Sequence, residues 1–172
     1  VIRLTAGHQA KVEEKPEVRK AGGVYYTPKY IVDYIVENTV GKLLEGKTPT
    51  EAAALKIVDP ACGSGAFLLG ASQYIVTQLA IKAGSKDLTP DEDGFVRTSV
   101  AAALTEKAQA ILASSLWGYD IDATMVRLGL MNLMMHGIDE PHIDYKDTLS
   151  KSYTEESKYD FVMANPPFTG SI

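Results

Sequence analysis

Residues 55–84 read LKIVDPACGSGAFLLGASQYIVTQLAIKAG, and this stretch decides the fold class. The apolar run over residues 55–58 is typical of a buried strand in a parallel sheet. Gly63 and Gly65 predict a tight turn, because glycine adopts backbone angles that other residues avoid. The apolar residues from 66 to 83 then predict a helix. A strand, a glycine turn and a helix in this order indicate an α/β fold with a parallel sheet.

The rest of the sequence repeats this alternation of strands and helices. Asp122 is a good N-cap for a helix that ends at Gly137. Three further strands are predicted at residues 115–122, 142–149 and 158–168, and a further helix at residues 98–113. We therefore expect a mostly parallel sheet with helices on both faces.

A helix is also predicted ahead of residue 55. Thr27 offers a capping hydroxyl, Pro28 suits the first helical position, and Gly46 is a plausible end. The apolar residues that recur here at helical spacing are Ile31, Tyr34, Ile35 and Leu43.

Composition limits the kind of protein. A chain of 172 residues is long enough for one domain with a real core, and no apolar run approaches a membrane span. Cys62 is the only cysteine, which excludes a disulfide framework and favours the cytoplasm. The three scattered histidines form no cluster of metal-ligand spacing, so no metal site is predicted.

The charge is distributed unevenly. Residues 1–30 carry a net charge of +3, whereas the whole chain carries −5. We interpret residues 1–23 as a polar N-terminal arm and residues 24–172 as the folded domain. A protein that grips nucleic acid by itself usually has a basic face. Any polyanionic partner would therefore be held mainly by something other than the surface of this chain.

Acidic residues follow several predicted strands. Ligands of open α/β sheets bind beyond the carboxyl ends of the strands. Asp120 could accept hydrogen bonds from both hydroxyls of a ribose, and Asp147 could accept one from an exocyclic amine. Asp59 ahead of the glycine turn suits an amino-bearing ligand better than a pyrophosphate. Leu68 stands where a dinucleotide fingerprint would have its third glycine, which disfavours a nicotinamide enzyme.

The segment 159–168, YDFVMANPPF, carries a different chemistry. The amide oxygen of Asn165 and a carbonyl next to proline could both accept hydrogen bonds from one amino group. Two such acceptors draw the nitrogen lone pair out of conjugation and toward a methyl donor. Phe168 could stack on a flat base. The structural alternative is an ordinary proline loop after a strand.

These signals, in this order, resemble the S-adenosylmethionine-dependent DNA adenine-N6 methyltransferases of restriction–modification systems. The resemblance covers about residues 20–170 and is greatest to type I modification subunits and fused type IIG enzymes. It rests on the segments GVYYTPKYIVDYIVE, IVDPACGSGAFLLGA, LWGYDIDATMVRLGLMNLMMHG and YDFVMANPPF. It implies a Rossmann-like methyltransferase fold of seven strands, of which this chain would hold the first four in its cofactor-binding half.

The resemblance also implies roles for individual residues. The residues expected to be catalytic would hold the target amino group or stack on the flipped base. They are Asn165, Pro166, Pro167 and Phe168. Phe168 occupies the stacking position, where tyrosine is the commoner residue of the family. The residues expected to bind S-adenosylmethionine lie in four segments: Thr27, Pro28, Asp59, Ala61, Gly63, Gly65, Asp120, Ile121 and Asp147.

The implied partners are double-stranded DNA and specificity or restriction subunits, or fused domains, with no membrane. A target-recognition domain and the later strands are expected after Ile172. We therefore expect residues 1–172 alone to be inactive, with an unpaired edge at the fourth strand.

Three alternatives stay open. A protein-glutamine or RNA amino-methyltransferase uses the same Asn-Pro-Pro-aromatic segment, although YYTP ahead of the glycine turn favours the DNA class. A non-catalytic subunit could keep the fold. Adenine N6 and cytosine N4 present the same amino group, so the sequence does not separate them.

Overall fold

The computed structural model describes residues 2–4, 10–12, 26–84, 86, 89, 112 and 114–166. The chain divides into two compact units, and the larger one spans Thr27–Asn165. The smaller unit comprises Val1–Tyr26 and Pro166–Ile172. The predicted helix at residues 98–113 lies, apart from Leu112, outside the described residues.

The smaller unit contains two strands that sequence analysis did not predict. Strand β1 (Ile2–Leu4) pairs antiparallel with β2 (Ala10–Val12). Their sequences, Ile-Arg-Leu and Ala-Lys-Val, alternate apolar and charged residues, which is the period of a strand. The prevailing polarity of residues 1–23 concealed this short alternation.

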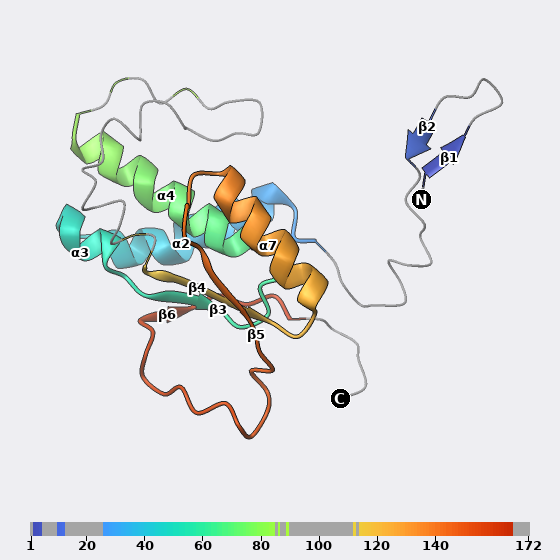
Figure 1. Cartoon of the computed structure of the whole chain (residues 1–172). Coiled ribbons are helices and arrows are strands. Elements are labelled where there is room, and N and C mark those ends of the chain that lie inside the picture. Colours follow the sequence, from blue (N-terminus) through green and yellow to red (C-terminus); the bar gives the residue numbers. More distant parts are fainter. Residues whose placement is uncertain are drawn as a thin grey trace. The chain divides into compact units, whose positions relative to one another are not determined.

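The larger unit is built on a sheet of four parallel strands (Figure 1). Its order is β5-β4-β3-β6. The strands are β3 (Ile57–Asp59), β4 (Leu116–Asp120), β5 (His142–Tyr145) and β6 (Phe161–Val162). All four predicted strands are therefore present, and their parallel direction is confirmed.

The strand order reverses at β3. From β3 the chain continues to β4 and β5 on one side, and it returns to β6 on the other side. Such a reversal opens a crevice beyond the carboxyl ends of the strands, where ligands of this fold class bind. Asp59 ends β3 and Asn165 follows β6, so these two residues lie at the reversal.

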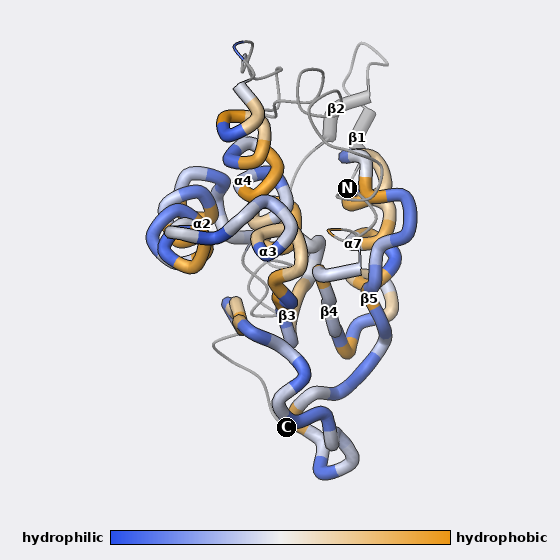
Figure 2. Tube along the Cα trace, turned by 90° about the vertical axis from the view of Figure 1, so that its left-hand side faces the viewer, coloured by the Kyte–Doolittle hydropathy of each residue, from blue (hydrophilic) through white to orange (hydrophobic). Residues whose placement is uncertain are grey.

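Helices cover one face of this sheet (Figures 1 and 2). The side chain of Ile143 in β5 lies close to Gly65, at the start of α4, and to Gly129 of α7. Helices α4 and α7 therefore lie on the same face of the sheet. The helix α2 packs on α4, where a Cβ at Gly70 would meet Val32 at 2.6 Å. The helices are α2 (Lys29–Leu44), α3 (Pro49–Ala53), α4 (Ala66–Lys82) and α7 (Ala123–Met135).

The most buried residues of α2 are not those whose spacing predicted the helix, although Ile35 and Leu43 of that set pack against the core. Val32, Val36, Val40 and Leu44 are buried, whereas Tyr34 is 68% exposed and Ile35 is only partly buried. Both sets recur at helical spacing, so the pattern predicted the helix but not the face. The small valines are on the inside because α2 approaches Gly70 of α4 closely.

The opposite face of the sheet carries the β5–β6 connection, which is mainly hydrophilic in Figure 2. Glu155 accepts hydrogen bonds from Lys146 Nζ at 2.9 Å, from Tyr119 at 2.9 Å and from Tyr159 at 2.8 Å. The bond from Lys146 is the main cause that lowers the pKa of Glu155 to about 2. These contacts hold the connection on β4. Helices were predicted on both faces of the sheet. Among the described residues, it is this connection that covers the second face.

Candidate functional site

The turn between β3 and α4 is shaped by two glycines. Gly65 has φ +79° and precedes α4 directly, and Gly63 has φ +54°. A Cβ at position 65 would lie 2.5 Å from Leu133 of α7, whereas a Cβ at position 63 would meet nothing within 4 Å. Position 65 thus requires glycine for both conformation and space, and position 63 leaves open room above the turn.

Asp120 at the end of β4 holds this turn in place. Its Oδ2 accepts a hydrogen bond from Gly63 N at 2.8 Å, and its Oδ1 accepts one from Asp122 N at 2.8 Å. Asp122 in turn accepts a bond from Thr124 N at 2.7 Å, which confirms it as the cap of α7. The glycine turn and the end of β4 are therefore joined through one carboxylate.

Asp59 is the most enclosed acidic residue of the site, with 1% of its surface exposed. Its Oδ1 accepts a hydrogen bond from Ala61 N at 3.0 Å. Burial raises the pKa of the Asp59 carboxyl to about 7; the Ala61 bond acts against this shift, and the charge of Asp120 adds to it. Near neutral pH the carboxyl is therefore divided between its protonated and ionised forms.

We expect Asp59→Asn to make the protein more stable than the original at pH 8 and equally stable near pH 4. The carboxyl has a higher pKa folded than unfolded, so the folded state binds more protons between about pH 4 and pH 7. Stability is therefore lost as the pH rises through this window. Asparagine keeps an oxygen for Ala61 N but carries no charge.

At pH 8, the free energy of unfolding of Asp59→Asn should exceed that of the original protein by about 2–4 kcal/mol, since one pKa unit corresponds to about 1.4 kcal/mol. Thermal unfolding at a series of pH values measures it. Asp144→Asn, at an exposed position of β5, is the matched control. A gain that is the same at pH 4 and pH 8 would contradict the assignment.

The other two residues expected beside a nucleoside are both exposed. Ile121 follows Asp120 and is 65% exposed. Asp147 follows β5, and its Oδ1 accepts a hydrogen bond from Leu149 N at 3.0 Å. The neighbouring Thr148 donates to Pro60 O of the glycine turn at 3.0 Å. Sequence reasoning missed Thr148, because no local pattern indicates a bond between residues 88 positions apart.

Asn165 and Thr27 are brought together from opposite ends of the larger unit. Asn165 Nδ2 donates a hydrogen bond to Thr27 Oγ1 at 2.9 Å. Thr27 is not the predicted helix cap, because Pro28 occupies the N-cap position of α2 and no side chain caps the helix. The helix begins at Lys29, so Pro28 precedes it rather than occupying its first position.

The structure does not test the roles of the other predicted catalytic residues. Pro166 belongs to the smaller unit, and Pro167 and Phe168 lie outside the described residues. Their roles stay predictions.

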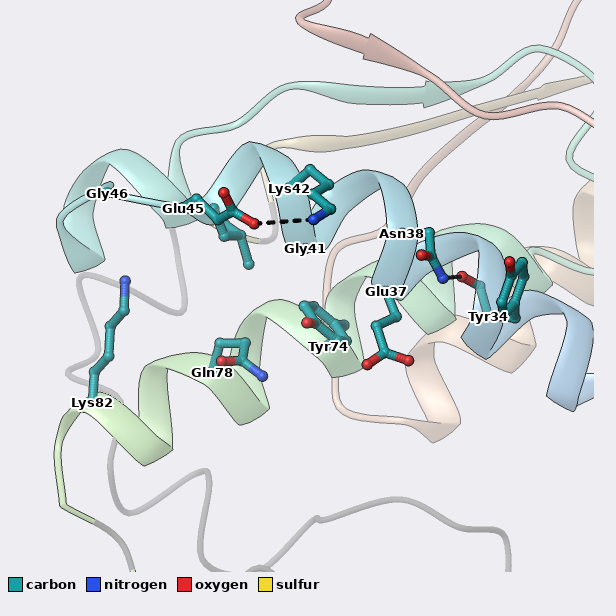
Figure 3. A pocket seen from close by; sticks show the side chains of 11 residues that line it. Tyr34, Glu37, Asn38, Gly41, Lys42, Glu45, Gly46, Tyr74, Gln78 and Lys82 are labelled. Carbon is teal, nitrogen blue, oxygen red and sulfur yellow. Dashed lines mark hydrogen bonds and ion pairs between the residues drawn. The ribbon is translucent and has the colours of Figure 1, made fainter.

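Hollows lie between helices in the described part of the chain. One of about 470 Å³ is lined by Thr27 and by Ala66 at the start of α4, together with Gly70, Gln73 and Asn132. A larger one of about 550 Å³ lies between α2 and α4, and Figure 3 shows its lining residues. It extends to Lys82, at the end of α4 remote from the glycine turn. The smaller hollow therefore meets the candidate site at Thr27, although Asp59, Asp120 and Asn165 do not line it.

Among the described residues, no helix has the length and apolar character needed to cross a membrane. The same part of the chain brings together no group of three or more His, Cys, Asp or Glu side chains that could hold a metal ion.

The arrangement of strands and helices matches a solved methylase structure. The crystal structure of the M protein of type I restriction enzyme EcoKI superposes with a TM-score of 0.59 and 24% identity. The match covers 85% of this chain and 26% of that protein. The chain therefore has the Rossmann-like methyltransferase fold predicted from its sequence.

A family model described as N-6 DNA Methylase matches residues 13–171. The chain belongs to the N-6 DNA methylase family. It is 28% identical over 151 residues to the type II methyltransferase M.VspI of Vibrio sp. (strain 343), covering 85% of the chain. It is 26% identical over 159 residues to the type I restriction enzyme EcoEI methylase subunit of Escherichia coli, covering 90%. The chain spans about a quarter of the length of these relatives.

Proposed function

We propose that the protein transfers a methyl group from S-adenosylmethionine to the N6 amino group of adenine in DNA, within a restriction–modification system. The observation that carries this proposal is the amide of Asn165, held by Thr27 just beyond β6. Membership of the N-6 DNA methylase family supports it, as do relatives named as methylases.

The residues at the carboxyl edge fit a cofactor that bears a nucleoside. Each oxygen of Asp120 accepts one N–H, which leaves a lone pair on each for the hydroxyls of a ribose. Ile121 offers an exposed apolar surface to a flat ring. Asp147 keeps one oxygen for an exocyclic amine, and the open space at Gly63 allows close approach to the backbone.

S-adenosylmethionine, when bound, supplies an electrophilic methyl group on a positively charged sulfur. The Asn165 amide oxygen accepts a hydrogen bond from the adenine amino group, and a main-chain carbonyl beside Pro166 accepts a second. The amino nitrogen forms a bond to the methyl carbon while the carbon–sulfur bond breaks and its electron pair stays on sulfur. The nitrogen then releases one proton to solvent.

The target base must leave the double helix, because its amino group is otherwise paired. We assign the stacking of this flipped base to Phe168. The excess of acidic residues beyond residue 30 indicates that other surfaces hold the DNA phosphates. Specificity and restriction subunits, or fused domains, are the proposed protein partners, and the cytoplasm is the proposed compartment.

The test uses the full-length protein with unmethylated DNA and S-adenosylmethionine, followed by digestion and identification of nucleosides by mass. N6-methyladenine is the expected product. N4-methylcytosine would keep the chemistry and change the base. If no methylated nucleoside forms and the methyl label is found on protein or RNA, the glutamine or RNA alternative replaces this proposal.

A further inference from the structure

We propose that Thr27 is a positioning residue that orients the Asn165 amide, an inference that rests on the proposed function. The two side chains are 138 positions apart, and their bond of 2.9 Å joins the segment before α2 to the segment after β6. From its sequence, Thr27 was predicted to cap α2 and to lie beside the cofactor. The structure assigns its hydroxyl to the catalytic amide instead.

The amide of Asn165 has two chemically opposite ends. A target amino group offers hydrogens, so only the amide oxygen serves it, and the amide NH₂ group would repel it. Because Nδ2 donates to Thr27, Oδ1 is directed away from that hydroxyl. Within the described residues, no donor bonds to Oδ1. The oxygen is therefore kept available for the target.

The hydroxyl of Thr27 is able to donate as well as accept, so it selects one amide orientation only when its own hydrogen points elsewhere. Thr27 lines the hollow of about 470 Å³ between α2, α4 and α7. A hydrogen-bond acceptor in that hollow, whether water or ligand, would take the hydroxyl hydrogen. The lone pair of Thr27 then faces Asn165, as the structure has it.

The hydroxyl is tested by two matched variants of the full-length protein. Thr27→Val keeps the shape and removes the hydroxyl, and Thr27→Ser keeps the hydroxyl. At saturating S-adenosylmethionine and DNA, we expect Thr27→Val to lower kcat about 10- to 100-fold, because a misplaced catalytic group slows the reaction by up to about 100-fold. Thr27→Ser should stay within about threefold, and the KM for the cofactor should change little.

Two kinetic outcomes would overturn the inference. If Thr27→Val raises the cofactor KM and leaves kcat unchanged, Thr27 serves only the cofactor. If Thr27→Ser loses as much activity as Thr27→Val, the methyl group is what matters. Thermal unfolding of both variants shows whether lost stability explains lost rate.

A second readout does not need catalysis. In protein labelled with ¹⁵N-asparagine, the side-chain NH₂ signals of Asn165 are assigned by their absence in Asn165→Asp. We expect Thr27→Val to shift them and Thr27→Ser to leave them in place. Signals unmoved by Thr27→Val would refute the bond even in an active enzyme. A shift in a protein that methylates no DNA would instead refute the proposed function and keep the bond.

Discussion

Replacing Asn165 with alanine in the full-length protein is expected to lower the rate of DNA methylation by about 10²- to 10³-fold, with little change in folding. In the proposed reaction the amide oxygen is the acceptor that prepares the target nitrogen for attack, and removal of one such preorganised group typically costs about 10²–10³-fold in kcat. The variant also leaves the hydroxyl of Thr27 without its partner amide. Methylated nucleosides counted against time, at saturating substrates, measure the loss.

Asn38→Ala is the matched control for this experiment. Asn38 lies on α2, is exposed, and donates its amide only to Tyr34 O of the same helix at 2.8 Å, among the described residues. We expect it to keep at least about half of the original rate. If Asn165→Ala keeps a comparable rate, Asn165 is not the catalytic amide.

Replacing Gly65 with alanine is expected to destabilise the fold by about 2–5 kcal/mol. Two effects combine at this position. A φ of +79° costs a residue with a Cβ about 1–2 kcal/mol, and forced overpacking costs about 1–3 kcal/mol more. The overpacking arises because the new Cβ would lie 2.5 Å from Leu133 Cδ1. The lowering of Tm on thermal unfolding measures the sum.

Gly46→Ala separates the two effects. Gly46 has a similar φ of +74°, but a Cβ there would meet nothing within 4 Å. Its variant should show the conformational cost alone, about 1–2 kcal/mol. Adding Leu133→Ala to Gly65→Ala should make the two substitutions less than additive, because the clash is removed. Equal losses for Gly46→Ala and Gly65→Ala would show that the contact with Leu133 is relieved without cost.

Local sequence patterns predicted most of the fold. The apolar run before Asp59, the glycines of the turn and the cap at Asp122 each express a preference that acts over a few residues, and the structure confirms them. Local patterns failed where two answers fitted equally well. The helix α2 has two apolar stripes, and only the close approach to Gly70 selects the stripe of valines.

The candidate site was predictable as a set of residues but not as a set of contacts. Asp120, Asp59 and Asn165 were identified because polar residues after strands gather at one edge of a parallel sheet. Asp59 bonds locally, to Ala61 N, whereas one bond of Asp120, to Gly63 N, and the bond between Asn165 and Thr27 join positions far apart in the sequence. A hydroxyl leaves no periodic signal in the sequence, so Thr27 was interpreted as a helix cap.

The position of β6 has a consequence for the order of folding. Ile57 and Val58 pair with β4 on one side and with Phe161 and Val162 on the other, more than a hundred residues later. During synthesis, the side of β3 that receives β6 therefore waits unpaired until the chain beyond residue 162 emerges. An exposed apolar strand edge is prone to pair with other chains. Chaperones on ribosome-bound chains should therefore contact the free side of β3 until β6 has docked, and after that point the open side of this sheet is that of β6.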